Sequence, residues 1–130
     1  MAPASLIIVE RAYRGSIETQ FADVLYIVRE LNRQIDELHL SLRGLAVTYA
    51  LESYGFTPAL RVGGRELDTL PNPRASLHVM LQEGLTLWVD DEDLASFGAK
   101  AATRLLPGTR RIKHGELAIQ WADYEQVWFM

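Results

Sequence analysis

The sequence predicts an α/β fold: a single three-layer domain over residues 1–130, with a mostly parallel sheet of about five strands and helices on both faces. Three observations predict it. Short apolar runs alternate with segments of helical periodicity along the chain. The first run, residues 6–9, is continuously apolar and β-branched, as expected for a strand buried on both faces. A length of 130 residues fits one domain, and no linker or internal repeat is found.

The first half of the chain is expected to contain two strands and a long helix. After the strand at 6–9, a polar loop leads to Ser16, whose hydroxyl can cap a helix by accepting from a free backbone N–H. Apolar residues then recur at helical spacing, which predicts an amphipathic helix over 16–35. Residues 38–42 are predicted to form a second strand. After the Arg43-Gly44 turn, residues 45–51 are predicted to be helical.

The middle of the chain contains two turn signals. Gly63-Gly64 lies between two short segments, 60–62 and 65–67, which favours a tight hairpin or a tight loop. Pro71 and Pro73 then end regular structure, because each lacks a backbone donor and restricts the residue before it.

The second half returns to a regular alternation. A helix is predicted over 74–83, ended by Gly84. The elements predicted after it are a strand over 85–89, a helix over 90–97, a helical stretch over 99–106, a short strand over 110–113, a short helix over 116–121 and a last strand over 127–129.

Composition excludes several classes of protein. The net charge of −4 argues against a general nucleic-acid binder, which carries a basic stripe. No apolar run approaches the roughly 20 residues that cross a bilayer. Residues 1–5 lack the basic start and apolar core of a secretory signal, so a cytoplasmic protein is expected. The chain contains no cysteine, which fits that compartment and excludes thiol chemistry on its own side chains.

Four consecutive acidic residues, 90–93, form the most conspicuous cluster. Carboxylates suit a hard cation such as magnesium or calcium. The other interpretation places them at a helix N-terminus, where negative charge meets free N–H groups. We favour the second, because four consecutive carboxylates at a helix start point in different directions. No metal site is therefore predicted.

The loop after the first strand is the other candidate site. It follows the carboxyl end of that strand, where open α/β sheets bind ligands. Its two arginines could hold an anion, although an exposed loop with a serine cap explains the same residues. Neither a GxGxxG fingerprint nor a P-loop is present. The candidate ligand-binding residues are Arg11, Tyr13, Arg14, Gly15, Ser16 and Asp90.

Other chemistry-bearing residues show no catalytic or metal-binding spacing. The histidines, at 39, 78 and 114, are far apart, and without cysteine a structural zinc site is not expected. The serines lack the GxSxG context of an exposed nucleophile. No catalytic residue and no cofactor are therefore predicted. The basic group Arg104, Arg110, Arg111 and Lys113 is read as a solvated face, with docking of an acidic partner as the alternative.

The three tryptophans, at 88, 121 and 128, are interpreted as core or interface residues. Aromatic residues are enriched at protein interfaces, so three of them in so short a chain make an oligomer interface plausible.

The segment 84–98, GLTLWVDDEDLASFG, carries a recognisable arrangement. It contains a glycine, a strand, a residue at the strand end and a second glycine eight residues after that: Gly84, residues 85–89, Asp90 and Gly98. This resembles the DsrE/DsrF/DsrH-like family, which includes the TusB, TusC and TusD sulfur-relay subunits. The closing part of the chain, with its Pro-Gly turn, short strand, helix and last apolar strand, is also similar to that family.

The resemblance implies both a function and a departure from it. Active members keep a cysteine at the strand end and pass a persulfide between a donor and an acceptor. Chemistry requires a thiolate there, and a helix N-terminus lowers the pKa of such a thiol. Here the position is Asp90, and a carboxylate cannot hold a transferable sulfane sulfur. The family also implies rings of three and stacked hexamers, some of which mix active and cysteine-less subunits.

Three functional hypotheses follow. The first is a non-catalytic, cysteine-less subunit or paralogue of a cytoplasmic sulfur-relay or sulfur-oxidation complex, which forms a trimer or hexamer with related subunits and docks partners such as a sulfur-carrier protein. The second is a small-molecule or anion-binding module that uses the pocket between the first loop and Asp90. The third is an enzyme with Asp90 or Asp91 as general base, which ranks last because the sequence identifies no partner acid or nucleophile.

Overall fold

Five parallel strands form the central sheet of the protein. A computed structural model describes residues 5–10, 24–34, 37–52, 60–67 and 73–130 of the chain. The strand order is β6-β5-β2-β1-β7, and every neighbouring pair is parallel. The predicted α/β fold with a mostly parallel sheet of about five strands is therefore confirmed. The strands are β1 (Ser5–Val9), β2 (Leu38–Leu42), β5 (Thr86–Asp90), β6 (Arg110–Ile112) and β7 (Gln126–Phe129).

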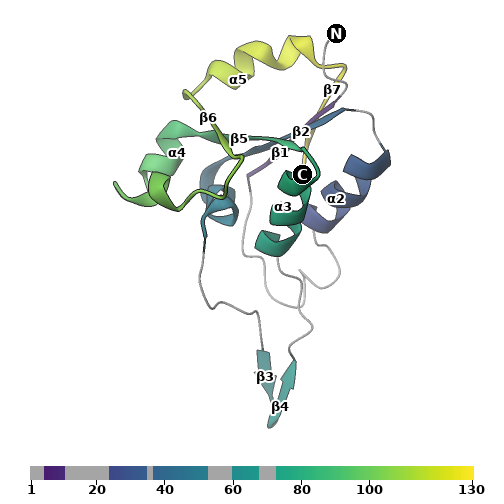
Figure 1. Cartoon of the computed structure of the whole chain (residues 1–130), viewed down its shortest axis with the longest axis vertical. Coiled ribbons are helices and arrows are strands. Elements are labelled where there is room, and N and C mark those ends of the chain that lie inside the picture. Colours follow the sequence, from purple (N-terminus) through teal and green to yellow (C-terminus); the bar gives the residue numbers. More distant parts are fainter. Residues whose placement is uncertain (1–4, 11–23, 35–36, 53–59, 68–72) are drawn as a thin grey trace.

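The two faces of the sheet are covered unequally. One face packs against α2 (Val24–Gln34), α3 (Pro73–Gln82) and the 3-10 helix η1 (Gly44–Ala50), while the short α5 (Glu116–Ile119) and η3 (Gln120–Asp123) cover the other (Figure 1). Strand side chains alternate between the faces because the strand period is two residues.

Strand β1 shows that alternation clearly. Ile7 and Val9 belong to the larger buried cluster, under α2 and α3, while Leu6 and Ile8 belong to the smaller one. All four side chains are buried, as the continuous apolar run predicts. The sheet is therefore buried on both faces, which is the environment that parallel strands require.

Most of the predicted helices are confirmed in position, some of them with different bounds. The helix predicted over 16–35 is observed as α2 from residue 24 to residue 34, and residues 16–23 lie outside the described residues. The helix predicted over 90–97 is α4 (Asp91–Ala95). The helix predicted over 45–51 is instead the 3-10 helix η1.

The helical stretch predicted over 99–106 is largely wrong. Only four residues of it form a helix, the 3-10 turn η2 (Ala101–Arg104). The backbone at its C-terminal end bonds to another segment: the Leu106 N–H donates to the Ala50 carbonyl at 2.8 Å, and the Glu52 N–H donates to the Arg104 carbonyl at 2.7 Å. These long-range bonds occupy groups that a longer helix would use, so tertiary contacts override local propensity.

The predicted hairpin is confirmed. Strands β3 (Leu60–Val62) and β4 (Arg65–Leu67) pair antiparallel around Gly63 and Gly64, whose φ angles of 58° and 78° lie in the left-handed region that glycine favours. The hairpin projects away from the main sheet (Figure 1). Within the described residues, no helix is long and apolar enough to cross a membrane.

Candidate functional site

The carboxyl edge of the sheet gathers charged side chains from four segments that are distant in sequence. Glu10 follows β1, Arg43 follows β2, Asp90 ends β5 and His114 lies two residues after β6. Because all these strands are parallel, their carboxyl ends meet at one edge, where α/β proteins bind ligands.

Asp90 is the best-connected residue of this edge. Its side chain is 11% exposed and both carboxylate oxygens are engaged. Oδ1 accepts the Asp93 backbone N–H at 2.9 Å, which caps α4, and Oδ2 accepts from His114 Nδ1 at 2.9 Å. This carboxylate is therefore a fixed structural group, held by a helix start on one side and an imidazole on the other.

The other three acidic residues of the run point to different partners. Asp91 pairs with Arg111 at 2.6 Å, and Asp93 Oδ2 accepts the Gly44 N–H at 2.9 Å. Glu92 extends toward solvent, with its Oε2 3.6 Å from His114 Nδ1. Asp90 caps α4 and the other three acidic residues lie in its first turn, so the helix N-terminus interpretation of 90–93 is confirmed.

His114 is the functional candidate that sequence reasoning missed. Its hydrogen bond to Asp90, followed by the charges of Asp90, Glu92 and Asp93, raises the pKa of His114 above its ordinary value. The bond to Asp90 also fixes Nδ1–H as the donor and leaves Nε2 free of any other partner among the described residues. One signal could have found it: His114 directly follows a predicted strand, as Asp90 ends one, and parallel strands bring such ends together.

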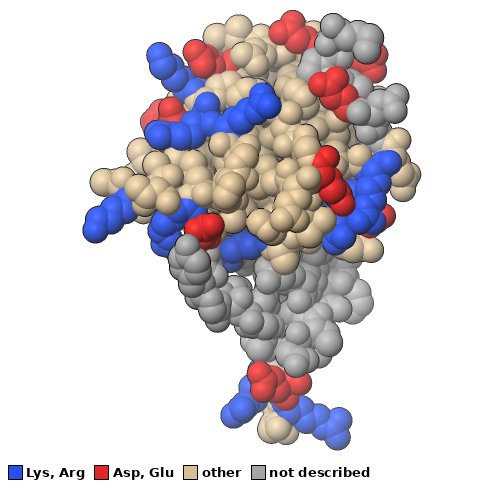
Figure 2. Space-filling view, in the orientation of Figure 1, with Lys and Arg blue, Asp and Glu red and all other residues tan. Residues whose placement is uncertain are grey.

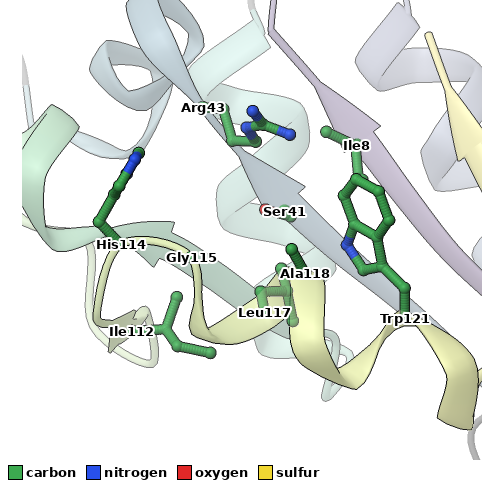
Figure 3. A pocket seen from close by; sticks show the side chains of 9 residues that line it. All are labelled: Ile8, Ser41, Arg43, Ile112, His114, Gly115, Leu117, Ala118 and Trp121. Atoms are coloured by element: carbon green, nitrogen blue, oxygen red, sulfur yellow. The ribbon is translucent and has the colours of Figure 1, made fainter.

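A pocket of about 260 Å³ lies beside His114. Figure 3 shows its lining, with Arg43 and His114 on one side and apolar side chains facing them. None of the described residues that line it is acidic. The lining residues are Ile8, Ser41, Arg43, Ile112, His114, Gly115, Leu117, Ala118 and Trp121.

Arg43 is the permanent positive charge of the pocket. Its guanidinium Nη1 lies 3.2 Å from Glu10 Oε1, and the side chain is 38% exposed. A guanidinium carries five N–H donors in a planar fork, so the pair with Glu10 leaves further donors available to a ligand.

The predicted site is only partly described by the structure. Of the six candidate residues, Asp90 is placed at the carboxyl edge, while Arg11, Tyr13, Arg14, Gly15 and Ser16 lie outside the described residues. Glu10, directly before that loop, contacts Arg43. The pocket that the structure does describe lies against α5 and η3, and sequence reasoning did not anticipate it.

The three histidines are dispersed, as predicted. His39 lies on β2. Its Nδ1 shares a hydrogen bond of 2.8 Å with the Tyr124 hydroxyl, and its Nε2 lies 3.3 Å from Glu37 Oε1. Burial lowers the pKa of His39. His78 on α3 contacts Gln82 at 3.2 Å. Within the part of the chain that the structure describes, the three histidines therefore contact different partners.

The basic group near the end of the chain is largely engaged within the molecule. Arg111 pairs with Asp91, Arg104 donates to the Glu52 carbonyl at 2.6 Å, and the Arg110 guanidinium lies 5.6 Å from the centre of the Trp88 ring. Charges of both signs are interspersed on the face shown in Figure 2. Among the described residues on this face, Lys and Arg side chains therefore alternate with acidic ones.

Comparison with known proteins supports the fold. No protein-family model and no curated protein sequence matches the chain. Several solved structures do, among them two that align with nearly the whole chain. The ychN protein from E. coli is 20% identical over 98% of this chain and 99% of its own, with a TM-score of 0.73. Protein MTH1491 from Methanobacterium thermoautotrophicum, a protein of unknown function, is 10% identical over 95% of this chain and 98% of its own, with a TM-score of 0.60. At these identities the similarity establishes the fold alone: a DsrE-like α/β fold with a parallel five-stranded sheet.

Proposed function

We propose that the protein is a non-catalytic, cysteine-less subunit of a cytoplasmic sulfur-relay or sulfur-oxidation complex, and that it acts by oligomer assembly and partner docking. One observation carries the proposal. Asp90 ends β5 and caps α4, which is the position where the sulfur-relay proteins that this sequence resembles keep their persulfide cysteine. The DsrE-like fold supports the same reading.

The contacts of Asp90 explain why this subunit would not carry sulfur. A carboxylate has no nucleophilic sulfur with which to form a persulfide, and the chain has no other cysteine to supply one. Both of its oxygens are committed, to Asp93 and to His114. In this proposal, the residue at the strand end stabilises the fold instead of carrying a reactive thiol. The thiol belongs to a partner subunit or a carrier protein.

The side of the molecule formed by α5, η3 and β7 is a docking surface in this proposal. Ile119 and Phe129 are exposed to 81% and 57%, unusually high for large apolar side chains. The Phe129 ring packs edge-on against Trp121, with ring centres 5.6 Å apart. Apolar aromatic surface of this kind is typical of interfaces between subunits. The partner proposed for it is a related subunit within a trimer or hexamer.

Native mass spectrometry tests this function. The full chain is expressed alone and together with the products of its neighbouring genes, and the expected result is a trimer or hexamer, homomeric or mixed with a cysteine-containing subunit. Phe129→Asp is expected to reduce the native mass to the monomer, because a charge would be buried at the interface. The matched control is Val62→Asp, at a residue 65% exposed on the hairpin.

Two results would contradict the proposal. A strictly monomeric protein that captures no product of a neighbouring gene would exclude assembly and docking. Equal behaviour of the Phe129→Asp and Val62→Asp variants, both assembled like the wild type, would exclude the α5, η3 and β7 surface.

A second candidate function is a small-molecule or anion-binding module at the carboxyl edge. The pocket between Arg43 and Trp121 favours it, because its described lining contains a guanidinium and an imidazole but no carboxylate. Inorganic phosphate or acetate should then raise the melting temperature in proportion to occupancy. A melting temperature that is unchanged with either anion, and with any organic acid, would exclude this module.

A further inference from the structure

We propose that the pocket beside His114 binds a small amphipathic organic acid, whose carboxylate is held by Arg43 and His114 and whose apolar body fills the space toward Trp121. This inference rests on the second candidate function, anion binding, and names the class of its ligand. The ligand is small, since about 260 Å³ lies just below the roughly 300–1,000 Å³ of pockets for drug-sized molecules.

The charged side of the pocket selects an anion. Arg43 keeps guanidinium donors beyond its contact with Glu10, and His114 Nε2 has no partner among the described residues. A carboxylate matches the guanidinium fork with two parallel hydrogen bonds. The carboxylates nearest to these two groups are Glu10, beside Arg43, and Asp90 and Glu92, beside His114; none of the three lines the pocket.

Asp90 prepares His114 for this role. It accepts the Nδ1–H at 2.9 Å, so the imidazole is fixed in orientation and its remaining nitrogen is directed away from Asp90. The charges of Asp90, Glu92 and Asp93 favour the protonated ring, which carries a donor at Nε2. Asp90, which stands in place of a reactive thiol in the proposed function, thereby positions the His114 imidazole for ligand binding.

The remaining lining selects an apolar body. Figure 3 shows Ile112, Leu117 and Ala118 on the side of the pocket opposite Arg43 and His114, with the Trp121 indole at its end. Ile112 and Leu117 belong to the smaller core cluster and are buried, so this wall is fixed by packing. Apolar atoms on one side, with a guanidinium and an imidazole on the other, match a molecule with one charged and one apolar end. Inorganic phosphate has no group that would use the apolar wall.

Matched small ligands test the class directly. The full chain is titrated with hexanoate, its neutral analogue hexanamide, acetate and inorganic phosphate, with calorimetry and tryptophan fluorescence as readouts. Hexanoate is expected to bind about tenfold or more tightly than hexanamide, because the charged hydrogen bonds are lost in the amide. From butyrate to hexanoate, each added methylene is expected to tighten binding about fourfold, because each one buries further apolar surface.

Variants separate the two ends of the site. Arg43→Gln and His114→Gln are expected to weaken hexanoate about tenfold each and to leave hexanamide unchanged. Their controls are Arg111→Gln and His78→Gln, which do not line the pocket. Ala118→Leu, which fills the apolar side, is expected to weaken both hexanoate and hexanamide. Ala122→Leu, on η3 and outside the lining, is its control.

The outcomes distinguish this inference from the function on which it rests. If acetate and hexanoate bind equally tightly and Arg43→Gln weakens both, the result supports the anion-binding function and contradicts the proposed amphipathic class of ligand. If no probe binds to the wild type, both proposals fail. Hexanoate binding that Ala118→Leu and Ala122→Leu weaken alike would also overturn the inference, because the apolar body would then lie elsewhere.

Discussion

At the scale of single residues, Asp90 shows how one side chain joins three parts of the fold. It ends β5, caps α4 and bonds to the histidine that follows β6. A capping bond and an ion pair are separable contributions, because asparagine can make the first and not the second. Substitutions at Asp90 can therefore measure each of them.

The first prediction concerns this residue. Asp90→Ala is expected to lower the free energy of unfolding by about 1–2 kcal/mol, since it removes the cap of α4. Asp90→Asn should cost less than half as much, because the amide oxygen still accepts the Asp93 N–H. Urea denaturation measures both. Asp91→Ala is the control: its pair with Arg111 is largely exposed, so a loss of no more than about 1 kcal/mol is expected. Equal losses for Asn and Ala would contradict the capping role.

The second prediction concerns pH, since two histidines act in opposite directions. The pKa of His114 is raised above 6.5 in the folded state, mainly by its bond to Asp90. Its contribution to stability is therefore complete below about pH 6.5 and is lost as the pH rises through the folded pKa. The pKa of His39 is lowered by burial. Its contribution is present above about pH 6.5 and is lost as the pH falls through the folded pKa.

NMR titration of the two imidazoles and denaturation between pH 5 and pH 8 check this prediction. His114→Gln should remove the decrease in the free energy of unfolding that occurs as the pH rises. His39→Gln should remove the decrease that occurs as the pH falls. Asp90→Asn should return the pKa of His114 toward 6.5. A His114 pKa that does not move in that variant would show that the bond to Asp90 is not the cause.

At the scale of elements, long-range contacts decide the segments whose local signal is weak. The stretch 99–106 has helical composition, yet its backbone bonds to residues 50–52. Strong local signals agree with the structure: all five residues of β1 and four of the five residues of β2 are buried, and both strands lie in the interior of the sheet. The buried side chains of the central strands should therefore contribute far more to the free energy of unfolding than the exposed side chains of the neighbouring helices.

The third prediction tests that ranking. Leu40, in the middle of β2, is fully buried, whereas Leu45, at the start of η1, is 57% exposed. Leu40→Ala is expected to lower the free energy of unfolding by about 2–5 kcal/mol, since it leaves a cavity in the core. Leu45→Ala should change it by about 0.5 kcal/mol or less. Thermal and urea unfolding measure both, and similar losses at the two positions would contradict the observed packing.

At the scale of the whole molecule, the protein combines a sheet buried on both faces with a hairpin that lies apart from it. Strands β3 and β4 pair with each other and form a separate two-stranded sheet. A two-stranded hairpin is marginally stable by itself. The two parts are therefore expected to differ in local stability.

The fourth prediction is that amide hydrogen exchange separates these parts. The amides of β1, β2 and β5 should exchange slowest, near the rate set by global unfolding, while those of β3 and β4 should exchange almost as fast as in a free peptide. Mass spectrometry of the isolated full chain measures this. Hairpin amides as protected as those of β2 would contradict it and would show that a partner surface covers the hairpin.

The sequence predicted the strands well because burial on both faces leaves a clear apolar signature. Residues 38–42 coincide with β2, 6–9 differs from β1 by one residue at its start, and 85–89 differs from β5 by one residue at each end. The hairpin at Gly63-Gly64 was also predictable, since few residues other than glycine adopt two consecutive positive φ angles. The acidic run was correctly placed at a helix start for a similar local reason.

The candidate site was predictable only in part. Asp90 could be found because it ends a strand and begins a helix, both of which are local features. His114 could not be paired with it, because it lies 24 positions further along the chain and the sequence between them does not specify the strand order. The pocket likewise depends on Ile8, Arg43 and Trp121, which come from separate elements and meet only in the folded chain.

By itself, the sequence determined the α/β class, the positions of the buried strands and the absence of any cysteine thiol from the chain. These follow from composition and from periodicity, which act over a few residues. The tertiary structure alone decided the strand order β6-β5-β2-β1-β7, the bond between Asp90 and His114, and the pocket beside them. The physical reason is that parallel strands are joined by long crossovers, so neighbours in the sheet are chosen by the packing of the whole molecule.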